Sequence, residues 1–249
     1  MAVRQPQPEG GKRDGLIRSA LRAELSRDAE RLGLNATAIE ALVERAPLTH
    51  WDARERIVAA EDAGGLTNFV IAGAVKVVCT GRRGSPIIVQ FVSPGQFFGL
   101  TWPSDRPQPR QFVAVAHVAS TVAMVSREAM LQAMAALPPG RSLRLMAYTW
   151  RALSRLLYEK CLLLTMPLRD RLAYELGVLA RDFGQPHEAG VMIALPLTHA
   201  DLAQLIAGTR ANVSRAVSEL CRAGQLAVID RQFVLPRFQT PALAAGPPR

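Results

Sequence analysis

The sequence predicts an α+β protein in which an antiparallel β-roll precedes one long helix and a C-terminal helix-turn-helix. Three observations predict this fold. Between about residues 56 and 127, short β-branched runs alternate with glycine turns, as is typical of antiparallel barrels and rolls. From about residue 139, apolar residues recur every seven positions, which indicates a long helix with an apolar seam. At 198–222, a capping motif, a glycine turn and a second helix follow one another, as in a helix-turn-helix.

The composition is that of a folded, basic protein. The chain has 249 residues, enough for one large domain or two ordinary ones, and its 49% hydrophobic and 20% charged residues are close to the globular average. The formal net charge of +9 favours a polyanionic partner such as nucleic acid, although many basic proteins bind none. No apolar run reaches the roughly 18 to 20 residues of a membrane span, and the N-terminus has no signal-like stretch. We therefore expect a cytoplasmic protein without a membrane partner.

Cysteine and histidine are distributed without the spacing of a metal centre. Cys79, Cys161 and Cys221 are far apart and none belongs to a C-x-x-C pair, the arrangement typical of cysteine-based metal sites. The four histidines lie in different segments. We expect neither a metal nor a cofactor.

Four runs carry the strand signal. They are FVIAGAVKVVCT (69–80), PIIVQFV (86–92), QFVAVAHV (111–118) and STVAMVS (120–126). Glycine or proline interrupts the pattern between them and marks the turns. Upstream, residues 16–46 read as helical, with Asn35 as the N-cap of ATAIEALVER.

The seven-residue repeat lies in a helix expected over 139–165. Its seam, at the a and d positions of about three heptads, consists of Leu143, Met146, Trp150, Leu153, Leu157 and Leu164. Such a stripe can pack on the helix's own domain, but the length of a helix that joins two domains favours a dimer interface. Pro167 should end the helix, and a second helix is expected over 169–183, before Gly184 and Pro186.

The clearest functional signal lies at 195–236. Thr198 and Asp201 form a T-x-x-D capping box, and Ala207-Gly208 makes a tight turn after a short helix. Thr209 can then cap a second helix that runs to about Arg222. Beyond it, QLAVID and QFVLP look like two short strands around Asp230-Arg231, which would form a wing.

The second helix is apolar on one side and polar on the other. Its apolar face comprises Val213, Ala216, Val217 and Leu220. On the opposite face, arginine can bond guanine bidentately, asparagine can bond adenine, and the helix N-terminus favours a phosphate. Two short helices with a solvated face also occur in proteins that bind no DNA, but the order of capping box, glycine turn, polar face and wing favours DNA. The expected DNA-binding residues are Thr198, Thr209, Arg210, Ala211, Asn212, Ser214, Arg215, Ser218 and Arg222.

This stretch resembles the winged helix-turn-helix of the Crp/Fnr (cyclic-AMP receptor protein / fumarate-nitrate regulator) family. Members often show a Ser-Arg-Glu-Thr-Val-Ser/Gly-Arg run where this chain has TRANVSR at 209–215. Both arginines, the valine and the serine match, whereas Ala211 replaces the glutamate, so the family's usual base contacts do not carry over in full. The resemblance covers about residues 40–236, because FVIAGAVKVV and PIIVQFVSPGQFFG are similar to the family's effector β-roll.

The resemblance implies a homodimeric transcription regulator. Its cyclic-nucleotide-binding-like β-roll with flanking helices would occupy 16–138, its dimerisation helix 139–165 and its winged helix-turn-helix 166–239. From composition we expect the polar tail at 1–15 to be disordered and the proline-rich tail at 240–249 to fray. The partners that the resemblance implies are a second copy of the chain, a near-palindromic double-stranded DNA site, RNA polymerase and a small anionic effector.

The effector pocket is where the resemblance fails. Cyclic-nucleotide-binding members hold the ribose with a Gly-Glu pair and the cyclic phosphate with an Arg-Ser/Thr pair. This chain has Gly99-Leu100 and Arg110-Gln111 at the corresponding positions. We therefore expect no response to cyclic AMP, with Arg110 left to hold another anion or to pair with an acid.

Two alternative functions are weighed against an effector-responsive regulator. In one, the effector domain is vestigial and the regulator is constitutive. In the other, the chain is an enzyme with an appended helical domain. The sequence contains no nucleophile elbow, Walker loop, dinucleotide fingerprint or HExxH, so we do not expect an enzyme.

Overall fold

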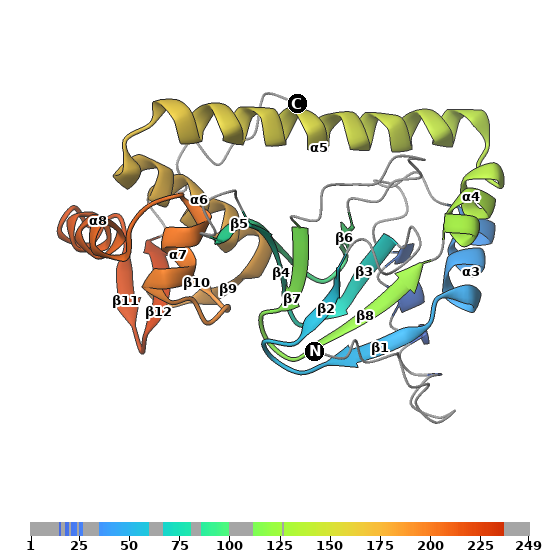
Figure 1. Ribbon diagram of the computed structural model, residues 1–249, viewed down its shortest axis with the longest axis horizontal. Helices are drawn as coiled ribbons and strands as arrows, with labels where there is room; N and C mark the ends of the chain where they lie inside the picture. Colours follow the sequence, from blue (N-terminus) through green and yellow to red (C-terminus); the bar gives the residue numbers. More distant parts are fainter. Residues whose placement is uncertain are drawn as a thin grey trace. The chain divides into compact units, whose positions relative to one another are not determined.

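The computed structural model describes residues 35–59, 67–80, 86–99, 112–125 and 127–236, together with short helical pieces between 15 and 26. The chain divides into two compact units, one of Met1–Thr80 with Gln90–Arg151 and the other of Gly81–Val89 with Ala152–Arg249. Figure 1 labels the helices and strands of the two units and colours them along the sequence. The predicted tails at 1–15 and 240–249 lie outside the described residues, Gly15 excepted. No helix in the described ranges combines the length and the apolar character needed to cross a bilayer.

Two antiparallel sheets form the roll, which belongs to the first unit apart from residues 86–89. One has the strand order β1-β8-β3-β6 and the other β2-β7-β4-β5. The strands are β1 (Leu48–Trp51), β2 (Arg56–Ala59), β3 (Thr67–Ala72), β4 (Val75–Thr80), β5 (Pro86–Val92), β6 (Phe97–Phe98), β7 (Phe112–Ala116) and β8 (Ser120–Val125). The antiparallel roll predicted from the glycine-bounded runs is confirmed, while β1, β2 and β6 are additional short strands.

Both faces of the β1-β8-β3-β6 sheet are buried. Phe69 of β3 belongs to a core shared with helices, whereas its neighbour Val70 belongs to a core between the sheets with Trp51 and Val122. Successive side chains of a strand point to opposite faces. A strand buried on both faces therefore reads as a continuous apolar run and not as an alternating one, which explains the FVIA segment.

The turn between β3 and β4 requires its glycine. Gly73 has a φ of +88°, in the left-handed region. A Cβ at this position would lie 2.4 Å from the Ala119 carbonyl oxygen. The hydroxyl of Ser120 fixes the same turn, because it donates to the Val118 carbonyl at 2.7 Å and accepts from the Ala74 amide at 3.1 Å.

Helices α3 (Ala36–Arg45) and α4 (Arg127–Ala135) lie side by side next to the roll (Figure 1). Asn35 is the N-cap of α3 as predicted, because its side-chain oxygen accepts from the Ala38 amide at 2.8 Å. The Asn35 amide group also donates to the Ala136 carbonyl at 3.1 Å, so one side chain begins α3 and ties it to the end of α4.

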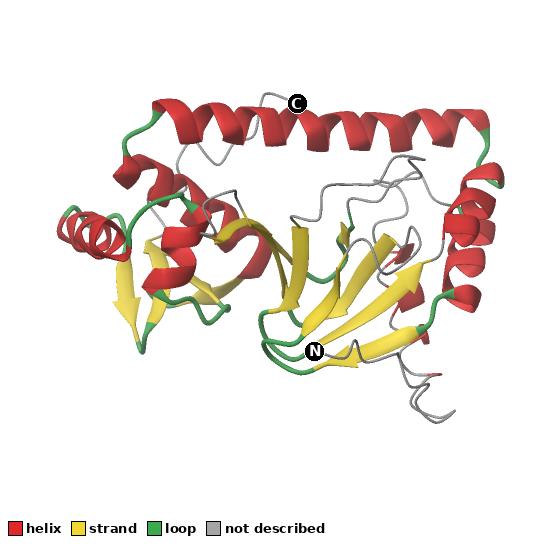
Figure 2. Cartoon of the chain, in the orientation of Figure 1, coloured by secondary structure: helices red, strands yellow, loops and turns green. Residues whose placement is uncertain are grey.

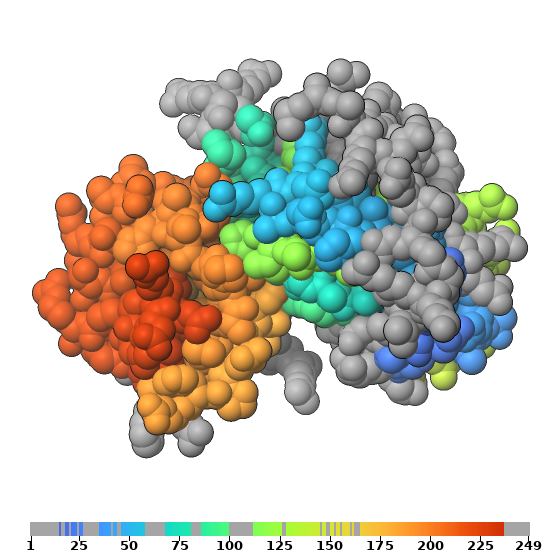
Figure 3. All heavy atoms as spheres, turned by 90° about the horizontal axis from the view of Figure 1, so that it is seen from below, coloured from blue at the N-terminus to red at the C-terminus, as the bar shows by residue number. Residues whose placement is uncertain are grey.

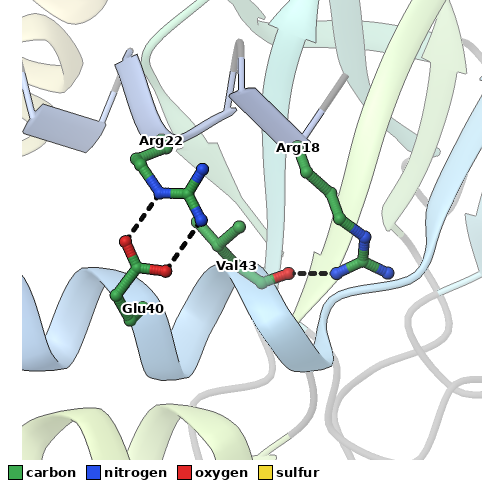
Figure 4. Close-up of polar contacts among 4 residues, drawn as sticks. All are labelled: Arg18, Arg22, Glu40 and Val43. Carbon is green, nitrogen blue, oxygen red and sulfur yellow. Dashed lines mark hydrogen bonds and ion pairs between the residues drawn. The ribbon is translucent and has the colours of Figure 1, made fainter. Parts of the chain in front are cut away.

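An N-terminal helical segment packs on α3 through apolar and polar contacts. Leu21 and Leu25 are 1% exposed and share a core with Leu42 of α3. Figure 4 shows Arg22 donating to both carboxylate oxygens of Glu40, at 2.6 and 2.8 Å, while Arg18 bonds the Val43 carbonyl. The hydrogen bonds from Arg22 lower the pKa of Glu40 below its ordinary value.

Helix α5 (Pro139–Thr165) is a continuous helix of 27 residues, as the heptad pattern predicts. The large apolar side chains of its seam are exposed to solvent: Trp150 is 71% exposed and Leu143 is 66% exposed. The other exposed members of the seam are Met146, Leu153 and Leu157, and the side chain of Leu164 lies outside the described residues. Pro167 separates α5 from the next helix, also as predicted.

The remaining elements belong to the second unit. They are α6 (Leu168–Phe183), β9 (Gly184–His187), β10 (Gly190–Ile193), α7 (His199–Leu205), α8 (Arg210–Arg222), β11 (Ala227–Ile229) and β12 (Gln232–Pro236). The strands form one sheet in the order β11-β12-β10-β9, drawn in yellow in Figure 2 with α6 and α7 in red beside it. In the space-filling view the orange to red atoms of this unit form one continuous surface (Figure 3). The sequence marks Gly184 and Pro186 as a helix stop but does not reveal the β9-β10 hairpin that follows.

Candidate nucleic-acid interface

A reciprocal cap begins α7. The Thr198 side chain accepts from the Asp201 amide at 3.1 Å, and the Asp201 carboxylate accepts from the Thr198 amide at 3.1 Å. The hydroxyl of Thr198 also donates to the same carboxylate at 2.6 Å. The predicted capping box is confirmed. Thr198 is exposed, but its hydroxyl hydrogen is already engaged with Asp201.

The turn between α7 and α8 depends on two residues for different reasons. Ala207 takes the left-handed conformation, with a φ of +52°, which residues other than glycine rarely adopt. Gly208 does not have a positive φ. Its lack of a side chain instead provides space, because a Cβ there would lie 2.7 Å from Leu168 Cδ1 of α6. The Gly208 amide completes the turn by donating to the Ala203 carbonyl at 2.9 Å.

Helix α8 begins at a capped N-terminus and is held by its apolar face. Thr209 Oγ1 accepts from the Asn212 amide at 3.2 Å, as predicted for an N-cap. The four residues predicted to form the apolar face are all buried: Val213, Ala216, Val217 and Leu220. This face packs against α6 and α7. The orientation of α8 is therefore fixed by tertiary contacts, and its other side faces solvent.

The outward side of α8 presents a polar, positively charged strip. At 100° per residue, the predicted central positions fall within about 60° of one another: Ala211, Arg215, Ser218 and Arg222. These four are exposed, and so are the flanking Arg210, Asn212 and Ser214 and the capping Thr209. The structure thus brings eight of the nine sequence-predicted residues together on α8 and its cap, and places Thr198 at the start of α7.

The chemistry of the strip suits a polyanion. Arg210, Arg215 and Arg222 supply three guanidinium groups, and the positive end of the helix dipole adds to them at the N-terminus. A helix of about 10–12 Å diameter fits a major groove about 12 Å wide. Ser218 donates its hydroxyl hydrogen to the Ser214 carbonyl at 3.1 Å, so it offers acceptor lone pairs outward.

A β-hairpin with a two-residue loop follows α8. Strands β11 and β12 pair with Ile229 opposite Gln232, and Asp230 and Arg231 between them have φ values of +48° and +64°. Two positive φ values in a two-residue loop match the turn type whose twist suits a hairpin. The predicted pair of strands is confirmed, and the exposed Arg231 at its tip is a cation in addition to the arginines predicted from the sequence.

Two further arginines contact the helix-turn-helix from α6. Arg171 Nη1 donates to the Ile206 carbonyl at 3.1 Å, and Arg169 Nη2 donates to Gln225 Oε1 at 2.8 Å. Their partners lie 35 and 56 residues further along the chain. Sequence reasoning misses these contacts, because no local pattern signals hydrogen bonds over such separations.

Little of the predicted effector pocket falls within the described part of the chain. Gly99 is exposed and has a φ of +121°. Leu100, Arg110 and Gln111 lie outside the described residues. Within the described ranges, no group of three or more histidine, cysteine, aspartate or glutamate side chains is placed to hold a metal ion, and the three cysteines are free thiols.

Comparison with known proteins assigns both units to recognised domains. Residues 48–136 match the cyclic nucleotide-binding domain, and residues 170–240 match the Crp-like helix-turn-helix domain. The global nitrogen regulator of Nostoc sp. is 31% identical over 171 residues, which are 67% of this chain and 75% of that protein. The chain belongs to the Crp/Fnr family of transcription regulators.

Other known proteins match most of the chain. A CRP-like cAMP-activated global transcriptional regulator of Mycobacterium tuberculosis is 24% identical over 82% of this chain and 90% of that protein. The solved structure of FixK2 from Bradyrhizobium japonicum is 26% identical with a TM-score of 0.66, over 80% of this chain and 96% of that one. This Crp/Fnr chain is therefore a transcription regulator with a helix-turn-helix DNA-binding domain, and its relatives and fold are not those of enzymes.

Proposed function

We propose that this Crp/Fnr regulator binds a near-palindromic DNA site as a homodimer, reads it with α8, and does not respond to cyclic AMP. The observation that carries the proposal is the geometry of α8. Its apolar face is buried against α6 and α7, so the polar strip with Arg210, Arg215 and Arg222 is held rigidly in solvent. Binding sites built on helices or strands hold their side chains more precisely than sites on loops do.

The direct test is DNA binding by the full chain at fixed salt. Labelled fragments of the host genome are incubated with the protein in the presence of excess random-sequence DNA, and retarded complexes are resolved by gel shift. Specific complexes that survive the competitor support a sequence-reading regulator. Retardation that the competitor abolishes for every fragment would mean that the positive charge binds DNA without reading it.

Helix α5 supports the homodimer. Five consecutive a and d side chains, from Leu143 to Leu157, are apolar and exposed, with Trp150 among them, and Lys160 occupies the next d position. An apolar stripe at heptad spacing buries itself most simply against an identical helix related by a twofold axis. A twofold dimer would present two copies of α8, and two copies require two half-sites of opposite orientation.

The identity of the pocket residues supports insensitivity to cyclic AMP. Leu100 offers no acceptor for a ribose hydroxyl, and Gln111 stands where cyclic-nucleotide-binding relatives carry a serine or threonine. Arg110 keeps its positive charge and suits a carboxylate or another small anion. A ligand-induced change in DNA affinity would separate an effector-responsive regulator from a constitutive one. RNA polymerase is a candidate partner of the DNA-bound dimer.

A further inference from the structure

The first turn of α6 contacts the polypeptide on both sides of α8. Leu168 lies against Gly208, just before α8 begins, and Arg171 donates a hydrogen bond to Ile206, which lies in the same α7-α8 connection as Gly208. Arg169 bonds Gln225, just after α8 ends. We propose that the first turn of α6 is a clamp that positions the recognition helix, with Arg171 acting as a positioning residue that never touches DNA and Gly208 leaving room for Leu168. The inference deepens the proposed function and rests on it.

Arg171 holds the end of α7. Its guanidinium donates to the carbonyl of Ile206, the C-cap residue of that helix, and the bond is partly buried. Carbonyl groups at a helix C-terminus carry partial negative charge and lack intrahelical partners. A hydrogen bond from a charged donor to this carbonyl is therefore stronger than one from a neutral donor. Because the next residues are Ala207 and Gly208, the bond fixes the start of the turn into α8.

Leu168 and Gly208 fit each other closely. A Cβ on residue 208 would lie 2.7 Å from Leu168 Cδ1 and 3.6 Å from Ile206 Cγ1. The first distance is far below ordinary van der Waals contact, so a methyl group there must displace the leucine. Any part of the displacement that the leucine side chain does not absorb moves the turn away from α6, and α8 begins two residues later at Arg210.

Arg169 holds the other end of the recognition helix. The Gln225 side chain that accepts its hydrogen bond belongs to a segment fixed to α8, because the Gln225 amide donates to the Leu220 carbonyl at 2.9 Å. One turn of α6 is thus linked to α8 before its N-terminus and after its C-terminus. Two separated attachments resist rotation of α8 about either end better than one attachment does.

The test compares specific with non-specific DNA affinity for Arg171→Lys and Gly208→Ala in the full chain. Lysine keeps the charge but not the planar, forked donor geometry. We expect each variant to lose roughly tenfold in specific affinity and to keep the non-specific affinity and the salt slope of the wild type. Arg181→Lys is the matched control on the same helix, since Arg181 donates to its sequence neighbour Asp182, and it should bind as the wild type does.

A double variant distinguishes positioning from general loss of structure. Leu168→Ala removes the atom that a Cβ at 208 would meet, so Gly208→Ala combined with Leu168→Ala should recover most of the specific affinity lost in Gly208→Ala. The clamp would be overturned if the double variant recovered no specific affinity. It would also be overturned if Arg171→Lys and Gly208→Ala both kept the specific affinity of the wild type. A reduced salt slope in Arg171→Gln, which removes the charge that lysine keeps, would also overturn it, because that result identifies a phosphate contact. If the wild type itself shows no specific binding, the proposed function fails first.

Discussion

Thr209 Oγ1 accepts a hydrogen bond from the Asn212 amide at 3.2 Å, and this contact caps the N-terminus of α8. Thr209→Ala removes the acceptor and leaves an orphan amide, so we expect the free energy of unfolding to fall by about 1 kcal/mol. Thr209→Ser keeps the hydroxyl and should lose little stability. Urea denaturation of both variants measures the difference. Equal stability of the alanine and serine variants would show that the cap contributes nothing.

Thr209→Asp extends the same experiment to DNA. Aspartate is a good N-cap, so this variant should be about as stable as the wild type, while its negative charge would repel a phosphate near the start of α8. We expect weaker DNA binding without loss of stability. Unchanged DNA affinity would place the N-terminus of α8 away from the phosphate backbone.

Arg215→Ala tests the centre of the polar strip. We expect a loss of about 1–3 kcal/mol of binding free energy at the specific site. Stability should be unchanged, because Arg215 is exposed and the apolar face of α8 is untouched. Arg181→Ala, which removes an arginine from α6 instead, serves as the control in fluorescence titrations at fixed salt. An equal effect of the two substitutions would mean that only net charge matters.

Leu157→Asp tests the α5 seam. The leucine is 58% exposed in the single chain, so the substitution should not unfold the protomer. In a dimer seam it would bury a charge, which is costly without a partner, so dimerisation and DNA binding should weaken together. Arg151→Asp introduces the same side chain one position beyond Trp150, outside the a and d positions, and should remain dimeric. If sedimentation finds that the wild type is a monomer at micromolar concentration, the α5 seam is not a dimer interface.

Cyclic AMP should bind poorly. A ribose hydroxyl facing Leu100 would go unpaired, and Gln111 lacks the hydroxyl donor for the phosphate. Losing two such groups costs about 2–6 kcal/mol, which is roughly 30-fold to more than 10⁴-fold in affinity. Calorimetry with cyclic AMP and cyclic GMP measures this directly. A micromolar Kd that Arg110→Ala abolishes would show that another side chain supplies the missing contacts.

The Arg22–Glu40 pair makes a pH-dependent contribution to the stability of the first unit. The hydrogen bonds from Arg22 lower the pKa of Glu40 in the folded state. The pair therefore contributes above the unfolded pKa of about 4.3, and this contribution is lost as the pH falls through the lower, folded pKa. Arg22→Gln should raise the pKa of Glu40 in an NMR titration. The same titration curve in both proteins would mean that the pair does not persist in solution.

Local signals in the sequence predict the helix-turn-helix well. The capping box and the N-cap bond each span four residues, and the amphipathic pattern of α8 repeats within its own 13 residues. Each of these features is decided by neighbours in the chain. Their positions therefore follow from the printed sequence, and the wing follows from the same kind of local turn chemistry.

Features that depend on distant partners escape this reasoning. Strand β1 has only four residues and is defined by pairing with β8, where Leu48 lies opposite Ala123. The hairpin of β9 and β10 begins with a Gly-Gln-Pro sequence that reads as a helix stop, and β12 completes its sheet from far along the chain. The space that Gly208 leaves for Leu168 is set by tertiary packing as well.

Selection of bound sequences from a random DNA pool tests the central claim most directly, because it reports sequence reading and twofold symmetry together. The account predicts one near-palindromic motif with half-sites about 34–36 Å, or roughly 10 base pairs, apart, and its loss when the selection is repeated with Arg215→Ala. Enrichment of no motif, or of a single asymmetric motif that Arg215→Ala selects equally well, would contradict the account.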